Sequence, residues 1–302
     1  MFWACCCLAL LGGCGNETAP IPTRTARRTA ASRPAGTPTA QSTQPVAGTP
    51  ASGAARGYRL AHVIVCLCDN KHQGIAPVPA ALGNGQDAAG NLHWGAMYGV
   101  KTFFHKSGRW EEVTGEIAVS LQDRGALRAM TLFRGAGRAN NVYVLAEAYD
   151  GSKMSLALRR FLEAAAGRLV RTVAVGRGRG QVILRAGGAA DLVCFVGHNG
   201  MMDDPPAHLP TDGPGPNPGG AVVLACKSAP YFAEPLRRAG CPPLITTSGL
   251  MAPEAYTLDA VLHAWGAGEP AATIHLRAAE AYAKYQKCRL AAAKNLFVCG
   301  GR

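Results

Sequence analysis

Five short apolar runs, each followed by polar or glycine-rich residues, recur between residue 58 and the carboxyl end of the chain. They are Ala61–Cys68, Val142–Ala148, Asp191–Val196, Ala221–Ala225 and Leu244–Thr247. Strands of a parallel sheet are buried on both faces, so they read as continuous apolar runs. Helix-like amphipathic stretches follow several of them, at Gly95–Lys106, Lys153–Ala166, Tyr231–Ala239, Pro253–Gly266 and Thr273–Ala293. We therefore predict an α/β domain over 58–302, in which helices flank a mostly parallel sheet.

The composition of the chain excludes several other classes of protein. Apolar residues make up 48% of the 302 residues and charged residues only 17%, which excludes wholesale disorder. The net charge is +12, but no aromatic-interleaved basic patch accompanies it, so we predict no nucleic-acid partner. The seven cysteines from Cys66 onward contain no C-x-x-C pair. We therefore predict neither a metal site nor a cofactor.

Residues 1–14 read MFWACCCLALLGGC, which is too short to span a bilayer. The end of this segment, Leu11-Gly12-Gly13-Cys14, resembles the lipobox of bacterial lipoproteins. The resemblance implies a signal peptide, lipid attachment at Cys14 and a place in the bacterial cell envelope, with Gly15 favouring the outer membrane. No Lys or Arg precedes Arg24, however, so a cytoplasmic protein without a functional signal is the alternative.

Residues 15–57 have a different composition from the rest of the chain. Thr, Ala, Pro, Ser and Gly dominate, and Glu17 is the single acidic residue. Such a segment cannot bury enough apolar surface to offset its chain entropy. We predict a disordered tether that precedes the α/β domain.

The residues that follow the third and fourth apolar runs are candidates for catalysis. In open parallel sheets, sites lie beyond the carboxyl ends of the strands. His198 follows the third run and Cys226 follows the fourth, so adjacent strands would place them side by side. A Cys where a strand turns into a helix is poised to form the nucleophilic thiolate, and a neighbouring His can exchange its proton. The alternative is that Cys226 is a small core residue and His198 a turn residue.

The two motifs VCFVGHNG and VVLACKS, in this order, resemble those of the caspase-like cysteine peptidases. This group includes caspases, legumains, gingipains, separases and bacterial CHAT proteases. The resemblance implies a three-layer α/β/α fold, with His198 as the catalytic histidine and Cys226 as the nucleophile. It also implies an oxyanion hole made by the backbone N–H groups of Cys226 and Gly200. Because Asn199 stands between His198 and Gly200, the N–H of Asn199 is an alternative donor.

Further candidates come from loops that line the substrate pocket in the resembling families. Asp69 and Asn70 follow the first apolar run, and Thr247 and Ser248 follow the fifth. Asp69, Asp203 or Asp204 could recognise a basic substrate side chain. The alternative for each carboxylate is a helix cap or a turn.

Together these features predict a lipid-anchored cysteine peptidase that acts on a peptide or protein substrate. Two alternatives stay open: a non-catalytic lipoprotein that binds an envelope partner, and a Cys-dependent hydrolase or transferase of a non-peptide acyl bond. Two local expectations complete the analysis. Ser152 and Ser228 are placed to cap helices, and Cys288 and Cys299 could pair in an oxidising compartment.

Overall fold

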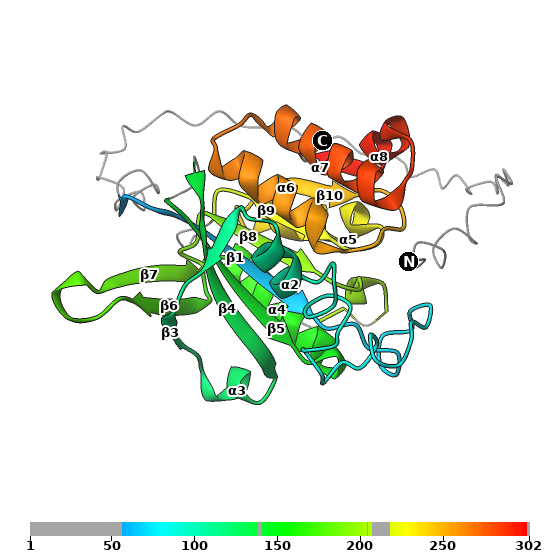
Figure 1. The fold of residues 1–302 in the computed structure, drawn as a ribbon. Coiled ribbons are helices and arrows are strands. Elements are labelled where there is room, and N and C mark those ends of the chain that lie inside the picture. Colours follow the sequence, from blue (N-terminus) through cyan, green and yellow to red (C-terminus); the bar gives the residue numbers. More distant parts are fainter. Residues whose placement is uncertain (1–55, 138–140, 204, 207–217, 301–302) are drawn as a thin grey trace, which may run out of the picture. The chain divides into compact units, whose positions relative to one another are not determined.

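The computed structural model describes residues 56–137, 141–203, 205–206 and 218–300 (Figure 1). The chain divides into two compact units, 1–48 and 49–302, and all described residues belong to the second. The predicted lipid attachment at Cys14, nearly all of the predicted tether and the predicted site residue Asp204 therefore lie outside the described residues.

An eight-stranded sheet forms the centre of the domain, in the order β11-β10-β9-β8-β1-β5-β4-β2 (Figure 1). Its strands are β1 (Arg59–Cys66), β2 (Trp110–Glu112), β4 (Leu127–Gly135), β5 (Val142–Tyr149), β8 (Leu192–Val196), β9 (Ala221–Leu224), β10 (Pro243–Thr247) and β11 (Phe297–Cys299). The neighbours from β10 through β5 pair in parallel, whereas β4, β2 and β11 pair antiparallel with their neighbours. The predicted α/β class and the mostly parallel sheet are confirmed, and each predicted apolar run overlaps one of these strands to within two residues at either end.

Helices cover both faces of this sheet. The helices α2 (Val100–Lys106), α6 (Ala255–Gly266) and α7 (Ala271–Gln286) bury apolar residues on one face, among them Phe104 and Ile274. The helices α4 (Met154–Ala165) and α5 (Ser228–Arg238) do so on the other face, through Phe161 and Phe232. The result is a three-layer α/β/α arrangement. Among the described residues, no helix is both long enough and apolar enough to cross a lipid bilayer.

Three local predictions were wrong. The predicted helix Thr273–Ala293 is two helices, α7 and α8 (Leu290–Leu296), because Lys287 takes a left-handed conformation with φ 52° and ends α7. Neither serine is an N-cap. The Asp150 carboxylate accepts the Ser152 N–H, and Ser228 lies inside α5 with its hydroxyl directed to the Val223 carbonyl.

The possible disulfide between Cys288 and Cys299 is absent. Both residues are free thiols, and the Cys299 Sγ lies 3.3 Å from the Ala271 carbonyl oxygen. Cys288 is exposed just after α7, whereas Cys299 ends β11, so the break at Lys287 separates the elements that carry them.

A second, three-stranded sheet was not predicted. It consists of β3 (Gly115–Ala118), β6 (Val170–Val175) and β7 (Val182–Gly187), all antiparallel. Its inner residues Val173 and Leu184 pack into the same apolar cluster as α4 and α5. The turn between β6 and β7 extends away from the main sheet (Figure 1).

Candidate active site

His198 and Cys226 follow adjacent parallel strands. Val196 of β8 pairs with Leu224 of β9, and the Gly197 N–H donates to the Leu224 carbonyl at 3.2 Å. His198 and Cys226 each lie two residues beyond this pair. Because neighbouring strands are about 4.8 Å apart, the two backbones lie side by side at the carboxyl-terminal ends of β8 and β9. The structure thus brings together the two predicted catalytic residues.

Two glycines allow the turn around His198. Gly197 has φ +152°, and a Cβ there would lie 3.0 Å from the Cys66 carbonyl oxygen. At Gly200, a Cβ would lie 2.4 Å from Cγ of Met154 on α4. Both positions therefore exclude larger residues for steric reasons. The Gly-His-Asn-Gly motif has a packing role in addition to any catalytic one.

The His198 side chain is held by Asp203. Its Nε2 lies 2.5 Å from Oδ2 of Asp203, whose side chain is 53% exposed. A carboxylate in this position fixes the orientation of an imidazole ring. Asp203, one of the predicted substrate-binding residues, thus contacts the candidate catalytic histidine.

The Cys226 thiol lies against the backbone of Met251, in the loop after β10. Its Sγ accepts a hydrogen bond from the Met251 N–H at 3.3 Å and lies 3.4 Å from the Met251 carbonyl oxygen. The next residue, Lys227, has φ 47° and donates its N–H to the Gly249 carbonyl at 2.8 Å. A left-handed non-glycine residue is strained, and such strain clusters at functional turns. The strained turn leaves Cys226 partly exposed at the start of α5.

Asn199 connects the turn after β8 to the turn after β9. Its buried side chain donates from Nδ2 to the Cys226 carbonyl at 2.7 Å, and its Oδ1 has no partner among the described residues. The N–H of Gly200 donates to the His198 carbonyl at 3.1 Å. The N–H groups of Asn199 and Cys226 make no hydrogen bond with a described residue. Among the described residues, these two N–H groups are unpaired, whereas the Gly200 N–H already has a partner; Asn199 itself is fully buried.

Thr247 and Ser228 make hydrogen bonds that fix the backbone on either side of Cys226. The Thr247 hydroxyl donates to the Ala225 carbonyl and accepts the Ser228 N–H, and the Thr247 N–H donates to the Ser228 hydroxyl at 2.9 Å. Both side chains are fully buried. The prediction that Thr247 contacts substrate is therefore replaced by a structural role. Ser248 is exposed, but its hydroxyl donates to the carbonyls of Asn295 and Leu296 at the end of α8.

The predicted substrate contacts after β1 are turn residues. Asp69 is buried, accepts the Lys71 N–H at 2.8 Å and lies 2.8 Å from Nδ1 of His72. The Asn70 side chain makes two hydrogen bonds with the backbone of Val78. These contacts agree with the alternative that Asp69 is a turn residue. Both oxygens of its carboxylate already have partners, so it is not available to a basic substrate side chain.

His93 lies near this site and was missed by the sequence analysis. The side chain is buried, with Nδ1 2.9 Å from the Cys66 carbonyl oxygen. Burial lowers the pKa of His93 to about 4; the bond to Cys66 opposes this effect, and the nearby His198 adds to it. His93 is therefore neutral at pH 7. A single His in a loop between a strand and a helix gives no sequence signal that would have identified it.

Most other described cysteines are poor nucleophiles. Burial raises the pKa of the thiols of Cys66, Cys68, Cys194 and Cys241. A raised pKa disfavours the thiolate, which is the reactive form. Of the less buried thiols, Cys288 and Cys299 lie at the end of α7 and on the edge strand β11. Among the described cysteines, only Cys226 follows β9, the strand that pairs with β8, after which His198 lies.

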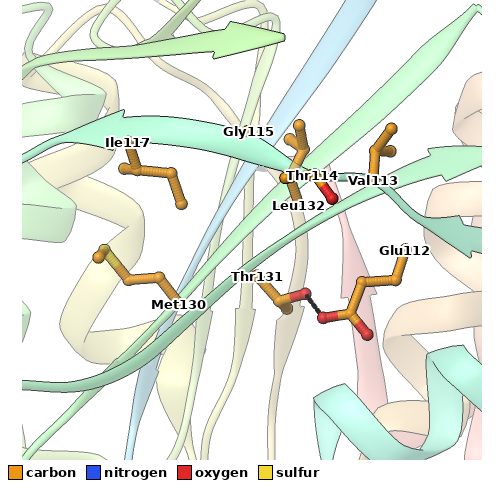
Figure 2. Close-up of a pocket in the computed structure, with 8 residues that line it drawn as sticks. All are labelled: Glu112, Val113, Thr114, Gly115, Ile117, Met130, Thr131 and Leu132. Carbon is orange, nitrogen blue, oxygen red and sulfur yellow. Dashed lines mark hydrogen bonds between the residues drawn. The ribbon is translucent and has the colours of Figure 1, made fainter. Parts of the chain in front are cut away.

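A hollow of about 230 Å³ lies elsewhere, where β3 diverges from β4 (Figure 2). Thr131 of β4 donates to Glu112 of β2 at 2.8 Å at one end of this hollow, and Ile117 and Met130 lie at the other. A second hollow of about 180 Å³ lies at the start of β4. Both hollows lie beside β4, far along the sheet from β8 and β9, whose carboxyl-terminal ends carry His198 and Cys226. No three His, Cys, Asp or Glu side chains within the described ranges are grouped to hold a metal ion.

No protein-family model, curated protein or solved structure matches this chain. The resemblance to caspase-like peptidases therefore stays a hypothesis based on the motifs VCFVGHNG and VVLACKS. The geometry around these motifs is the basis for the function proposed next.

Proposed function

We propose that this domain is a cysteine peptidase in which Cys226 is the nucleophile and His198 the general acid and base. One observation carries the proposal. The turns that bear the two residues follow adjacent parallel strands and are joined by the Asn199 hydrogen bond to the Cys226 carbonyl. This link between the two turns supports the proposal, because acyl transfer requires a nucleophile and a proton carrier close together.

In this proposal each group has a definite role. The Cys226 thiolate attacks the peptide carbonyl carbon, and the N–H groups of Asn199 and Cys226 bind the oxygen that becomes negative. Because Nε2 of His198 contacts Asp203, Nδ1 is the nitrogen left to take the thiol proton and return it to the leaving amine. Water then hydrolyses the thioester, which releases the acid product and restores the thiol.

The thiol and the imidazole make no hydrogen bond with each other in the described residues, since each has a partner of its own. Proton transfer to Nδ1 of His198 therefore requires the Cys226 thiol to turn away from the Met251 backbone, while His198 keeps its contact with Asp203. Catalytic hydrogen bonds are often long before substrate binds and shorten in the complex.

A peptide-based electrophile provides a direct test. Full-length protein should be labelled by an acyloxymethyl ketone of a mixed peptide library, and Cys226→Ala should abolish the label, because in this proposal Cys226 is the nucleophile that the peptide-bearing probe reaches. Cys288→Ala is the matched control, since Cys288 is the most exposed described thiol. Mass spectrometry of the labelled peptide reads the site.

The same experiment separates the alternative functions. Absence of label, or a label equally strong in Cys226→Ala, would overturn the peptidase proposal and leave the non-catalytic binding protein. Faster cleavage of esters than of matched peptides, again dependent on Cys226, would assign the site to a non-peptide acyl bond.

We further propose that the protein is lipid-anchored through Cys14 at the bacterial envelope, as the lipobox-like segment predicts. Several acyl chains buried in lipid make a firm anchor. Bacteria that express the full chain should incorporate radiolabelled palmitate into it, and Cys14→Ser should remove this label. Incorporation that persists in Cys14→Ser would contradict the assignment of the anchor.

A further inference from the structure

The tip of the β6–β7 hairpin exposes apolar side chains on both of its faces. Val182 and Ile183 are consecutive residues of β7 and are 46% and 48% exposed. Consecutive strand residues point to opposite faces, so each face of this end of the hairpin exposes about half of an aliphatic side chain, although Val175, opposite Val182, packs partly against the core. Farther along β7, Leu184 is fully buried. The hairpin therefore projects from the domain beyond Leu184, as its outline shows (Figure 1).

Positive charge surrounds these apolar residues. Arg177 lies in the turn, and Arg185 shares a face with Ile183; both are exposed, and neither forms an ion pair with a described residue. The sequence places Arg179 in the same turn. The acidic residue nearest in the ladder is the single Glu116 of β3, which pairs with Ala174, the residue opposite Ile183. Positive charge thus predominates at the tip.

We propose that the β6–β7 tip docks on an anionic lipid surface. Val182 and Ile183 enter the interfacial region, and Arg177 and Arg185 contact the phosphate groups. A combination of exposed aliphatic and basic side chains matches such a surface, which offers an apolar layer beneath negative charge. A nucleic acid matches less well, because the hairpin carries no aromatic side chain on which bases could stack. The proposal does not depend on the peptidase activity.

Vesicle sedimentation tests the proposal. The full chain is used with Cys14→Ser, so that acylation contributes nothing, and is mixed with vesicles of phosphatidylcholine alone or with phosphatidylglycerol in equal part. We expect binding to the anionic vesicles only, decreasing as salt increases. Arg177→Glu/Arg185→Glu and Val182→Asp/Ile183→Asp should each weaken this binding at least about tenfold. Val182→Ser/Ile183→Ser, a milder change, should weaken it in the same direction.

Two residues of the same region provide matched controls. Val170 is 82% exposed at the opposite end of β6, and Arg168 is exposed just before it. Val170→Asp and Arg168→Glu should leave vesicle binding unchanged. Equal binding by the tip variants and the parent chain would overturn the proposal, as would equal losses in the control variants. Binding to nucleic acid but not to anionic vesicles would also overturn it.

Discussion

Replacing Cys226 or His198 by alanine is expected to lower kcat/KM for peptide hydrolysis by at least about a thousandfold. The loss is large because the two residues act as a unit: without the imidazole the thiol keeps its proton, and without sulfur there is no acyl-enzyme. The double variant should therefore be no slower than either single variant by more than a few-fold. Steady-state kinetics on a peptide found in the labelling experiment measures all three.

Asp203→Asn belongs to the same series and should have a smaller effect. The carboxylate contacts His198 but is more than half exposed, so its charge is partly screened by solvent. We expect kcat to fall about tenfold to a hundredfold, within the range of general acid–base catalysis. The thermal unfolding of Asp203→Asn should match that of the wild type. Wild-type activity in Cys226→Ala would contradict the assigned mechanism, and an unchanged kcat in Asp203→Asn would remove Asp203 from it.

Arg171→Met is expected to lower the free energy of unfolding by about 3–5 kcal/mol, because it removes one partner from a buried ion cluster. Arg171 lies on β6 of the second sheet, and its Nε is 2.6 Å from Oε1 of Glu147 on β5 of the main sheet. Its Nη2 donates to Asp123 at 3.0 Å, and His62 Nε2 lies 3.3 Å from the Glu147 carboxylate. Arg171 thus joins the two sheets, and all four side chains are buried.

The charge state of Glu147 explains the size of this effect. Burial alone would raise the pKa of Glu147, but the nearby His62 and Arg171 hold this pKa below its ordinary value. The stability that Glu147 contributes is therefore present above the pKa of the unfolded chain and is lost as the pH falls through the lower pKa of the folded chain. Without Arg171, Glu147 must either stay charged in a buried position with one fewer positive neighbour, or bind a proton.

Urea unfolding at neutral pH measures the change, with Arg237→Met as the matched control. Arg237 lies 2.6 Å from Glu234, and both side chains are exposed, so its replacement should cost less than about 1 kcal/mol. Arg171→Met/Glu147→Gln should recover part of the lost stability, because it no longer buries an unpaired carboxylate. A loss as small in Arg171→Met as in Arg237→Met would show that the cluster does not hold the sheets together.

The strands of the main sheet could be predicted because each is an uninterrupted apolar run, buried on both faces. The second sheet could not be found by the same signal, since β7 alternates between exposed and buried residues such as Arg185 and Ala186. The Gly-Arg-rich turn at 176–180 between two β-branched stretches is the hairpin signal that was overlooked.

The positions of His198 and Cys226 were predictable for the same reason as the strands. A site residue that directly follows a strand is placed by that strand, so finding β8 and β9 places both residues at one edge. The roles of Asp69 and Thr247 were not predictable in this way. A carboxylate or hydroxyl after a strand can face substrate or the backbone, and local sequence is the same in both cases.

The sequence by itself determined the α/β class, the main strands and the order in which His198 and Cys226 leave them, because periodicity and burial are local properties of the chain. Only the tertiary structure decided which partners each polar side chain has. Asp203 contacts His198, Thr247 contacts Ser228, and Arg171 contacts Glu147. The last two pairs join residues from different elements, separated by about twenty positions in the sequence. Their partners are set by how strands and helices pack, and no local pattern in the sequence records that packing.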